Sequence, residues 1–97
     1  MFMNERYMTK GVQETMPRYQ QNLMWFLIDS MQTESRDYLQ VFTLSERDGK
    51  QHIVHTQEQP PYQQEQTVDA GGCSVVTAKI FVIDDTTHTT ILLAEEY

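Results

Sequence analysis

Residues 38–57 read YLQVFTLSERDGKQHIVHTQ, two runs rich in β-branched and aromatic residues on either side of a short polar turn. Such residues fit the pleated surface of a sheet and favour strands from Tyr38 to Ser45 and from Lys50 to Gln57. The Asp48-Gly49 pair supplies the positive backbone φ angles that a tight hairpin turn requires. The segment therefore predicts an antiparallel β-hairpin.

Three further strands are predicted after this hairpin. Pro60-Pro61 ends its second strand, because proline has no N–H to donate, and Tyr62 to Val68 follows as a glutamine-rich strand suited to a sheet edge. The runs from Val75 to Asp84 and from Thr89 to Glu95 are apolar and flank a turn. We expect them to form a second hairpin near the centre of the sheet.

The N-terminal third predicts one short strand and one main helix. Tyr7 to Val12 has the composition of a strand. Thr15 and Pro17 mark a helix start, since a hydroxyl caps free amides and proline suits the first turn, so we expect a helix from Met16 to about Gln32. Its apolar residues share one broad arc that would pack against a flat surface: Met16, Tyr19, Leu23, Met24, Phe26, Leu27, Ile28 and Met31.

These elements predict a single α+β domain over residues 1–97, with an antiparallel sheet of five to six strands and one main helix packed on one face. A chain of 97 residues can bury a core without disulfide or metal staples but leaves little room for a deep cleft. No glycine-rich turn joins a strand to a helix, which excludes dinucleotide and phosphate-loop sites.

Composition favours a cytoplasmic protein. The single cysteine, Cys73, has no partner in the chain, so the fold cannot rest on an internal disulfide and a reducing compartment fits best. The longest apolar run, Leu23 to Ile28, is far too short to span a bilayer, and the N-terminus lacks the pattern of a secretory signal. Neither export nor membrane insertion is predicted.

The net charge of −7 is unevenly distributed along the chain. Residues 1–57 hold seven acids and six bases, whereas residues 58–97 hold seven acids and one base, Lys79. We expect the acids of the second part to form one negative face, which would repel nucleic acid and membranes and attract a basic protein surface. These predicted partner-binding acids are Glu58, Glu65, Asp69, Asp84, Asp85, Glu95 and Glu96.

Two aromatic residues are candidate anchors for a partner, Trp25 and Tyr97. Trp25 falls on the polar arc of the predicted helix, between residues such as Arg18 and Asp29. A tryptophan there is either covered by its own chain, for which residues 1–7 are the natural segment, or offered to a partner as a binding hot spot.

No arrangement of residues predicts an enzyme, a metal site or a cofactor. His52 and His55 lie three apart on one strand, where alternation sends them to opposite faces. His88 with Asp84 and Asp85 is the one cluster that could hold a divalent cation or relay a proton. Turns, however, are rich in Asp for backbone reasons alone. We therefore expect this cluster to be structural.

Several strings resemble a family of small Gram-positive bacterial proteins known as domain of unknown function nine-sixty: Asp37 to Phe42, Ile53 to Pro60, Lys79 to Asp85 and Leu92 to Tyr97. Tyr7 to Val12 and Met24 to Asp29 also match its pattern. The resemblance implies no catalytic residue. It implies a setting on conjugative elements and prophages as well as chromosomes, where small acidic proteins often block host defence enzymes.

Two hypotheses of function follow. In the first, the chain is a non-catalytic anti-defence protein that occupies a basic nucleic-acid-binding surface, with the RNA-guided nuclease of type II CRISPR systems as the preferred partner and guide loading as one step to block. In the second, it is a housekeeping module that binds a small ligand, or a homodimer formed through the edge strand Tyr62–Val68. Acids that merely keep a small domain soluble remain the simplest reading of the charge.

Overall fold

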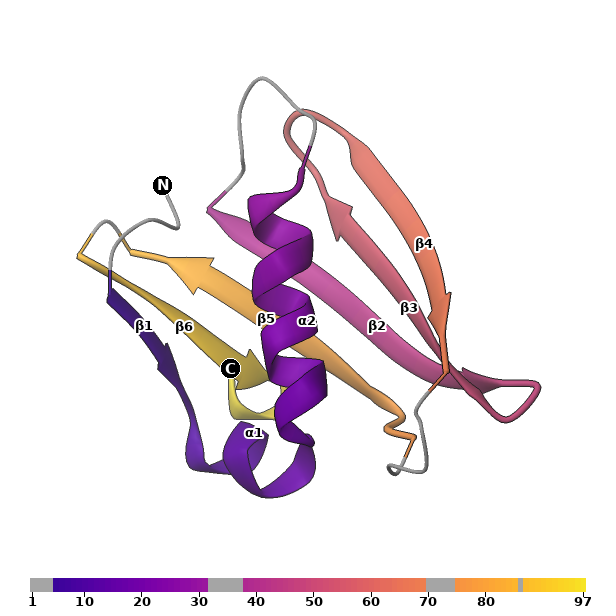
Figure 1. The fold of residues 1–97 in the computed structure, drawn as a ribbon. Helices are drawn as coiled ribbons and strands as arrows, with labels where there is room; N and C mark the ends of the chain where they lie inside the picture. The colour runs from indigo at the N-terminus through magenta and orange to yellow at the C-terminus, as the bar shows by residue number, and fades with distance from the viewer. Residues whose placement is uncertain (1–4, 32–37, 70–74, 86) are drawn as a thin grey trace.

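The computed structural model describes residues 5–31, 38–69, 75–85 and 87–97, which form a six-stranded sheet with two helices on one of its faces (Figure 1). Cys73 and the predicted helix end at Gln32 lie outside the described residues. The elements in chain order are β1 (Glu5–Met8), α1 (Lys10–Thr15), α2 (Arg18–Asp29), β2 (Leu39–Arg47), β3 (Lys50–Gln57), β4 (Tyr62–Val68), β5 (Ala78–Asp84), β6 (His88–Leu93) and the 3₁₀ helix η1 (Ala94–Glu96).

The sheet is mixed, with strand order β1-β6-β5-β2-β3-β4. The pairs β2–β3, β3–β4, β5–β6 and β2–β5 are antiparallel, whereas β1 runs parallel to β6. The chain leaves β1 at one edge, crosses the sheet through the helices and enters β2 in the interior. The predicted α+β class is therefore confirmed, and the sheet is antiparallel as predicted except for the pair β1–β6.

The two predicted hairpins and the edge position of Tyr62–Val68 are confirmed. Arg47 pairs with Lys50, so the first turn has two central residues, and both carry positive φ angles, 55° at Asp48 and 75° at Gly49. The glutamine-rich strand β4 is an edge of the sheet, as its polarity predicted. The apolar strand β5 lies between β6 and β2, away from either edge.

The prediction for residues 7–12 is wrong beyond Met8. Thr9 caps a helix instead: its side-chain hydroxyl accepts a hydrogen bond from the backbone N–H of Val12 at 3.3 Å, and residues 10–15 form α1. The main helix α2 consequently begins at Arg18, with Pro17 as its N-terminal flanking residue and no side-chain cap. Thr15 belongs to α1, and the extended backbone of Met16 separates the two helices.

The second hairpin is shorter than predicted, because β5 begins at Ala78 and not at Val75, and β6 ends two residues early. β6 ends at Leu93, and the chain turns into η1, so Glu95 lies in a 3₁₀ helix and not in a strand. The described helices are short, and none of them is long and apolar enough to cross a membrane.

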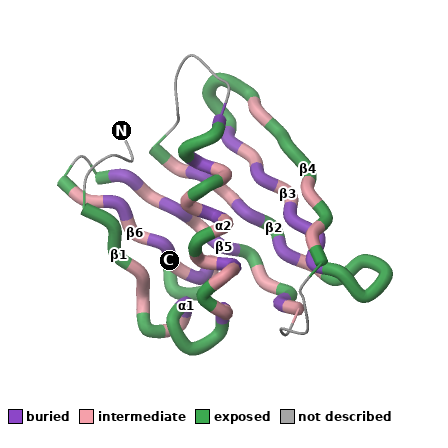
Figure 2. Tube along the Cα trace, in the orientation of Figure 1, coloured by how far each residue is buried: buried purple, intermediate pink, exposed green. Residues whose placement is uncertain are grey.

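The core lies between the helices and one face of the sheet (Figure 2). It contains Val12, Met16, Met24, Ile28, Phe42, Leu44, Ile53, Val76, Ile80, Val82, Ile91 and Leu93. The strand residues of this set are separated by even steps along each strand, as alternation requires for one face. The predicted apolar arc of the helix is correct except at Phe26, whose side chain is 62% exposed.

Buried glutamines complete the contact between α2 and the sheet. Gln20 on α2 and Gln51 on β3 are fully buried, and the Gln20 amide donates to Gln51 Oε1. Gln51 also accepts from the backbone N–H of Val76 at 2.8 Å and donates to the Val76 carbonyl at 2.9 Å and the Ser45 carbonyl at 3.0 Å. One side chain thereby satisfies the buried backbone groups of the segment that leads into β5.

Replacing Gln51 with leucine should destabilise the protein strongly. Leucine has a similar volume but leaves the N–H and C=O of Val76 buried without a partner, so we expect the free energy of unfolding to fall by about 3 kcal/mol. Denaturant unfolding measures this, with Gln63→Leu on the exposed side of β4 as the matched control. Equal effects of the two substitutions would contradict the role given to Gln51.

Candidate functional site

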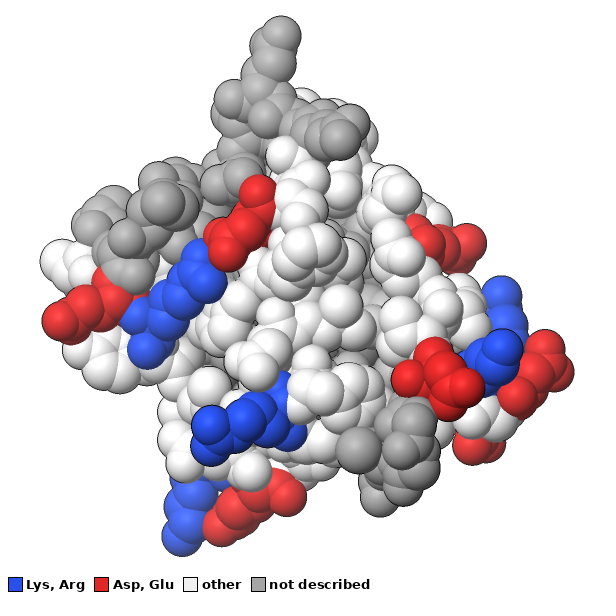
Figure 3. Space-filling view, viewed as in Figure 1, with Lys and Arg blue, Asp and Glu red and all other residues white. Residues whose placement is uncertain are grey.

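The seven predicted acids do not form one surface. Asp84 is buried at the end of β5, and its backbone N–H bonds to the Tyr38 carbonyl, which places Asp84 and the turn residue Asp85 at the end of the sheet where β2 starts. Glu58, in the β3–β4 turn, belongs to the same end. On the face covered by α2, acids lie at the margins and several stand beside Lys or Arg (Figure 3).

The remaining acids lie elsewhere along the sheet. Asp69 follows the far end of β4, Glu95 and Glu96 form η1 after the far end of β6, and Glu65 lies midway along β4. The expected continuous negative face is therefore divided between two ends and one edge of the sheet.

Glu96 has a structural contact that sequence reasoning did not foresee. Its carboxylate oxygen Oε1 accepts from the Thr9 hydroxyl at 2.6 Å and from the backbone N–H of Leu93 at 2.9 Å. The hydrogen bonds from Thr9, Leu93 and the backbone of Gly11 hold the pKa of Glu96 below its usual range. The side chain thus joins the C-terminal turn to the start of α1, where a negative charge is favourable.

Gly11 makes this contact possible. A Cβ atom at position 11 would lie 2.8–2.9 Å from the carboxylate atoms of Glu96, closer than non-bonded atoms approach. The absence of a side chain at Gly11 is therefore what lets the carboxylate reach the helix start.

Substituting Gly11 with alanine should displace Glu96 and lower stability. Because these atoms end a flexible side chain, the carboxylate can move aside and lose its hydrogen bonds, so we expect the free energy of unfolding to fall by at most about 1 kcal/mol in denaturant unfolding at neutral pH. The double variant Gly11→Ala/Glu96→Ala removes the clash, so alanine at position 11 should cost less in the Glu96→Ala background than in the wild type. Strictly additive effects would show that the two residues do not oppose each other.

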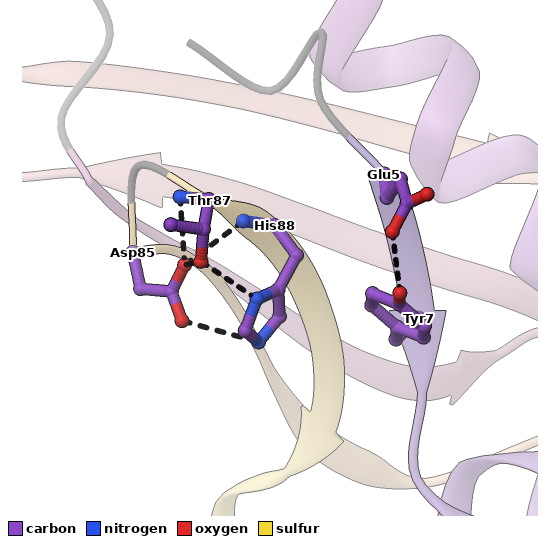
Figure 4. A network of polar contacts seen from close by, with 5 residues as sticks. All are labelled: Glu5, Tyr7, Asp85, Thr87 and His88. Carbon is purple, nitrogen blue, oxygen red and sulfur yellow. Dashed lines mark hydrogen bonds and ion pairs between the residues drawn. The ribbon is translucent and has the colours of Figure 1, made fainter.

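Of the three residues Asp84, Asp85 and His88, the last two contact each other in one turn. Asp84 is buried, whereas Asp85 and His88 are on the exposed turn between β5 and β6 (Figure 4). Asp85 Oδ1 accepts from the backbone N–H groups of Thr87 at 3.0 Å and His88 at 2.9 Å, and these bonds, that of His88 first, lower the pKa of Asp85. This is the backbone role expected of Asp in a turn.

Both ring nitrogens of His88 are engaged within this turn. Nε2 lies 3.1 Å from Asp85 Oδ2, and Nδ1 lies 2.9 Å from the Thr87 hydroxyl. The Tyr7 ring of β1 meets the imidazole edge-on at 5.2 Å, and its hydroxyl donates to Glu5 at 2.5 Å, which raises the pKa of Tyr7. Within the described ranges, no group of three or more potential metal ligands comes together. The contact between Tyr7 and His88 therefore joins the edge strand β1 to the turn before β6.

The two strand histidines lie on opposite faces, as alternation predicted. His55 is buried beneath α2, stacks on Phe42 with ring centroids 4.2 Å apart, and donates from Nε2 to Gln40 Oε1 at 2.7 Å. Burial lowers its pKa to about 4, so it is neutral near pH 7. His52 faces the other way, with Nδ1 3.0 Å from the Thr67 hydroxyl and Nε2 3.9 Å from Glu65.

His55 should make the fold acid-sensitive. Its pKa is about 4 when folded and about 6.5 in the unfolded chain, so below pH 6.5 the unfolded state binds the proton first and stability falls. This loss should reach about 3 kcal/mol at pH 4. Denaturant unfolding from pH 7 to about 4 should show it in the wild type and not in His55→Phe. Parallel pH profiles for the two proteins would exclude His55 as the cause.

The two predicted aromatic anchors differ in environment. Trp25 is half-buried, and the Arg6 guanidinium covers its ring at 4.5 Å from the centroid while bonding to Asp29 at 2.6 Å. Of the two expectations for Trp25, cover by the N-terminal segment therefore applies, and Arg6 is the residue that provides it. Tyr97 is 73% exposed and meets Phe81 edge-on with centroids 5.5 Å apart.

Phe81 belongs to an apolar surface that sequence reasoning missed. On β2, β5 and β6 the residues that alternate with the core residues point away from the helices, and cross-strand pairs join them into two rows. The rows are Val41, Phe81 and Leu92, and Leu39, Ile83 and Thr90. We call these six residues the open face, because neither α1 nor α2 covers this side of the sheet, where the Tyr97 ring contacts Phe81, and all six are only partly buried.

The open face has a small hollow at one end. Its volume is about 240 Å³, and it is lined by Tyr38, Leu39, Val41, Thr56, Gln57, Glu58 and Lys79. Pockets for small-molecule ligands are usually 300 Å³ or more, roughly, so this hollow suits one inserted side chain better than a metabolite. Glu58, a predicted partner-binding acid, lies at its rim together with the exposed ring of Tyr38.

Residues 5–96 match the family described as Staphylococcal protein of unknown function (DUF960). The chain belongs to this family. A similar fold is seen in a crystal structure of a protein of unknown function from Enterococcus faecalis, which is 25% identical and superposes with a TM-score of 0.85 over 97% of this chain and 91% of that one. No curated protein matches the chain. The family membership inferred from the strings of sequence is thus confirmed, whereas neither comparison supports the implied link to inhibition of host defence or carries an activity with it.

Proposed function

We propose that this DUF960 protein is a non-catalytic module that binds another protein through the open face. The single observation that carries the proposal is the pair of apolar rows across β2, β5 and β6, left without cover by the described helices. Apolar surface of this kind on a sheet is costly in water, and a partner that buries it gains roughly 25 cal/mol for each Å² removed from solvent.

Charge favours a protein partner over a nucleic acid. The two rows consist of apolar and hydroxyl side chains, and Lys79 is the base that borders them. Nucleic-acid binding requires an array of Lys and Arg that neutralises phosphates, and the net charge of −7 opposes it. The exposed tyrosines Tyr38 and Tyr97 flank the rows, and tyrosine is enriched at protein interfaces because it combines a large apolar ring with a polar end.

The hollow beside Val41 is the proposed anchor site. Binding energy in protein interfaces concentrates where one side chain fills a desolvated pocket. Glu58 and Lys79 at the hollow allow the partner's anchor to be polar at its tip, so an arginine or a tyrosine fits the lining better than a purely aliphatic residue.

The narrower hypothesis, inhibition of a type II RNA-guided nuclease, rests on the setting that the family resemblance implies, because the acids of residues 58–97 are divided between two ends and one edge of the sheet. Glu58 lies at the β2 end of the sheet, beside the hollow, and is available for a basic surface, while Asp84, Asp85 and Glu96 have structural roles. A cytoplasmic place of action, suggested by the lone Cys73, agrees with such a target.

The open face is tested by capture with matched surface variants. Lysine at position 41 or 92 adds a charge inside the apolar rows and should lower retention of a specific partner by roughly tenfold or more. Asn22→Lys adds the same charge on the exposed side of α2 and should leave retention unchanged. Wild type and the three variants are immobilised, checked for equal unfolding midpoints, and exposed to host lysate and to a purified type II RNA-guided nuclease.

A protein that wild type and Asn22→Lys retain, and that both open-face variants lose, supports the proposal. Retention that is equal in all four, or absent from all four, contradicts it. The purified nuclease decides the narrower hypothesis by the same comparison. Sedimentation tests whether the open face binds a second copy of this chain instead. If the wild type is a dimer and Val41→Lys is a monomer, the open face is a homodimer interface and the proposal of a partner protein is wrong.

A further inference from the structure

The edge strand β4 offers a second surface, separate from the open face. β4 pairs with β3 on one side, and no described strand pairs with its other side. Along an edge strand, alternate N–H and C=O groups point outward and can bond to another extended chain. β4 contains seven residues, Tyr62–Val68, and this length is sufficient to pair with a short peptide.

A groove runs beside this edge on the helix side of the sheet. It has a volume of about 430 Å³ and is lined by Phe26, Leu27 and Ser30 of the α2 end and by Tyr62, Gln64 and Gln66 of β4. Phe26 is 62% exposed, although the other apolar residues of α2 are at least partly buried. An apolar side chain from a strand added to β4 would face this groove at every second residue.

The charge along the edge has one sign. Residues 57–69 contain three acids, Glu58, Glu65 and Asp69, and no Lys or Arg. By alternation Glu65 points to the side opposite the groove, where the Nε2 atom of His52 lies 3.9 Å away. The edge therefore favours a partner strand that is apolar toward the groove and basic toward Glu65.

We propose that β4 accepts an extended basic segment of a partner protein as an additional strand of the sheet. The backbone of the segment bonds to the outward groups of β4. Its apolar side chains enter the groove beside Phe26, and its lysine or arginine side chains lie opposite Glu65. Recognition is thus divided between backbone hydrogen bonds, apolar contact and charge.

A second copy of this chain fits the edge less well. Antiparallel pairing of two β4 strands about their central residue places Glu65 opposite Glu65 of the second copy, and like charges directly opposite destabilise a sheet. Neither strand carries a base to offset them.

The test uses a defined probe, an eight-residue fluorescent peptide of alternating lysine and valine, whose binding is measured by anisotropy. Two further peptides carry N-methyl groups on the lysine amides or on the valine amides, with unchanged charge. In a strand added to β4 one set of amides faces β4 and the other faces solvent. We expect one methylated peptide to lose roughly tenfold or more in affinity and the other to bind like the parent.

Variants of the protein separate the contributions. Phe26→Ser and Glu65→Lys should each weaken the parent peptide by roughly tenfold, and Glu65→Lys should also reduce the dependence of binding on salt. Glu14→Lys, an exposed charge reversal on α1, controls for net charge. Val41→Lys on the open face should leave peptide binding unchanged, so this inference and the proposed function can fail separately.

Three results would overturn the inference: no peptide binding, equal tolerance of both methylated peptides, or equal weakening by Glu14→Lys and Glu65→Lys. A fourth is a concentration-dependent dimer of the wild type that excludes the peptide, because it would assign the β4 edge to a second copy.

Discussion

The alternation of side chains along β2, β5 and β6 is the constraint on which the rest of the structure depends. Even-numbered steps along these strands place Phe42, Ile80 and Val82 under α2, and the residues between them point away from it. A sheet with apolar residues on both faces needs a packing partner on each face, and the described helices pack on one face. The buried amide of Gln51 holds α2 against the sheet, since it bonds both to Gln20 of α2 and to Val76 in the segment before β5.

Most of the fold could be predicted from local patterns, and most of the candidate site could not. Asp48-Gly49 and the polarity of β4 gave correct strand positions, because turn geometry and edge exposure act locally. The strand prediction over residues 7–12 failed at Thr9, where a side-chain cap overrides strand composition. One available signal was overlooked: Ile80-Phe81-Val82-Ile83 is apolar on both alternations, and a single predicted main helix could not cover both faces.

The acidic residues show why charge in the sequence does not translate directly into a binding surface. Glu96 is held against the start of α1, Asp84 is buried, and Asp85 accepts backbone N–H groups of its own turn, so three of the seven predicted acids serve the fold. Glu58, Glu65 and Asp69 follow the β4 edge and contribute to a surface there. Sequence gives the number of charges, whereas their distribution depends on topology, here on η1 folding back to α1 and on β4 lying at an edge.

The central claim is that one side of the sheet is apolar and open to solvent, and side-chain NMR of the free protein tests it most directly. A soluble paramagnetic agent broadens the methyl signals of exposed groups. The account predicts strong broadening for Val41, Ile83 and Leu92 and little for their neighbours Val82, Ile91 and Leu44, which lie under the helices. Equal protection of both sets at concentrations where the chain is monomeric would show that the open face is covered, and would contradict the account.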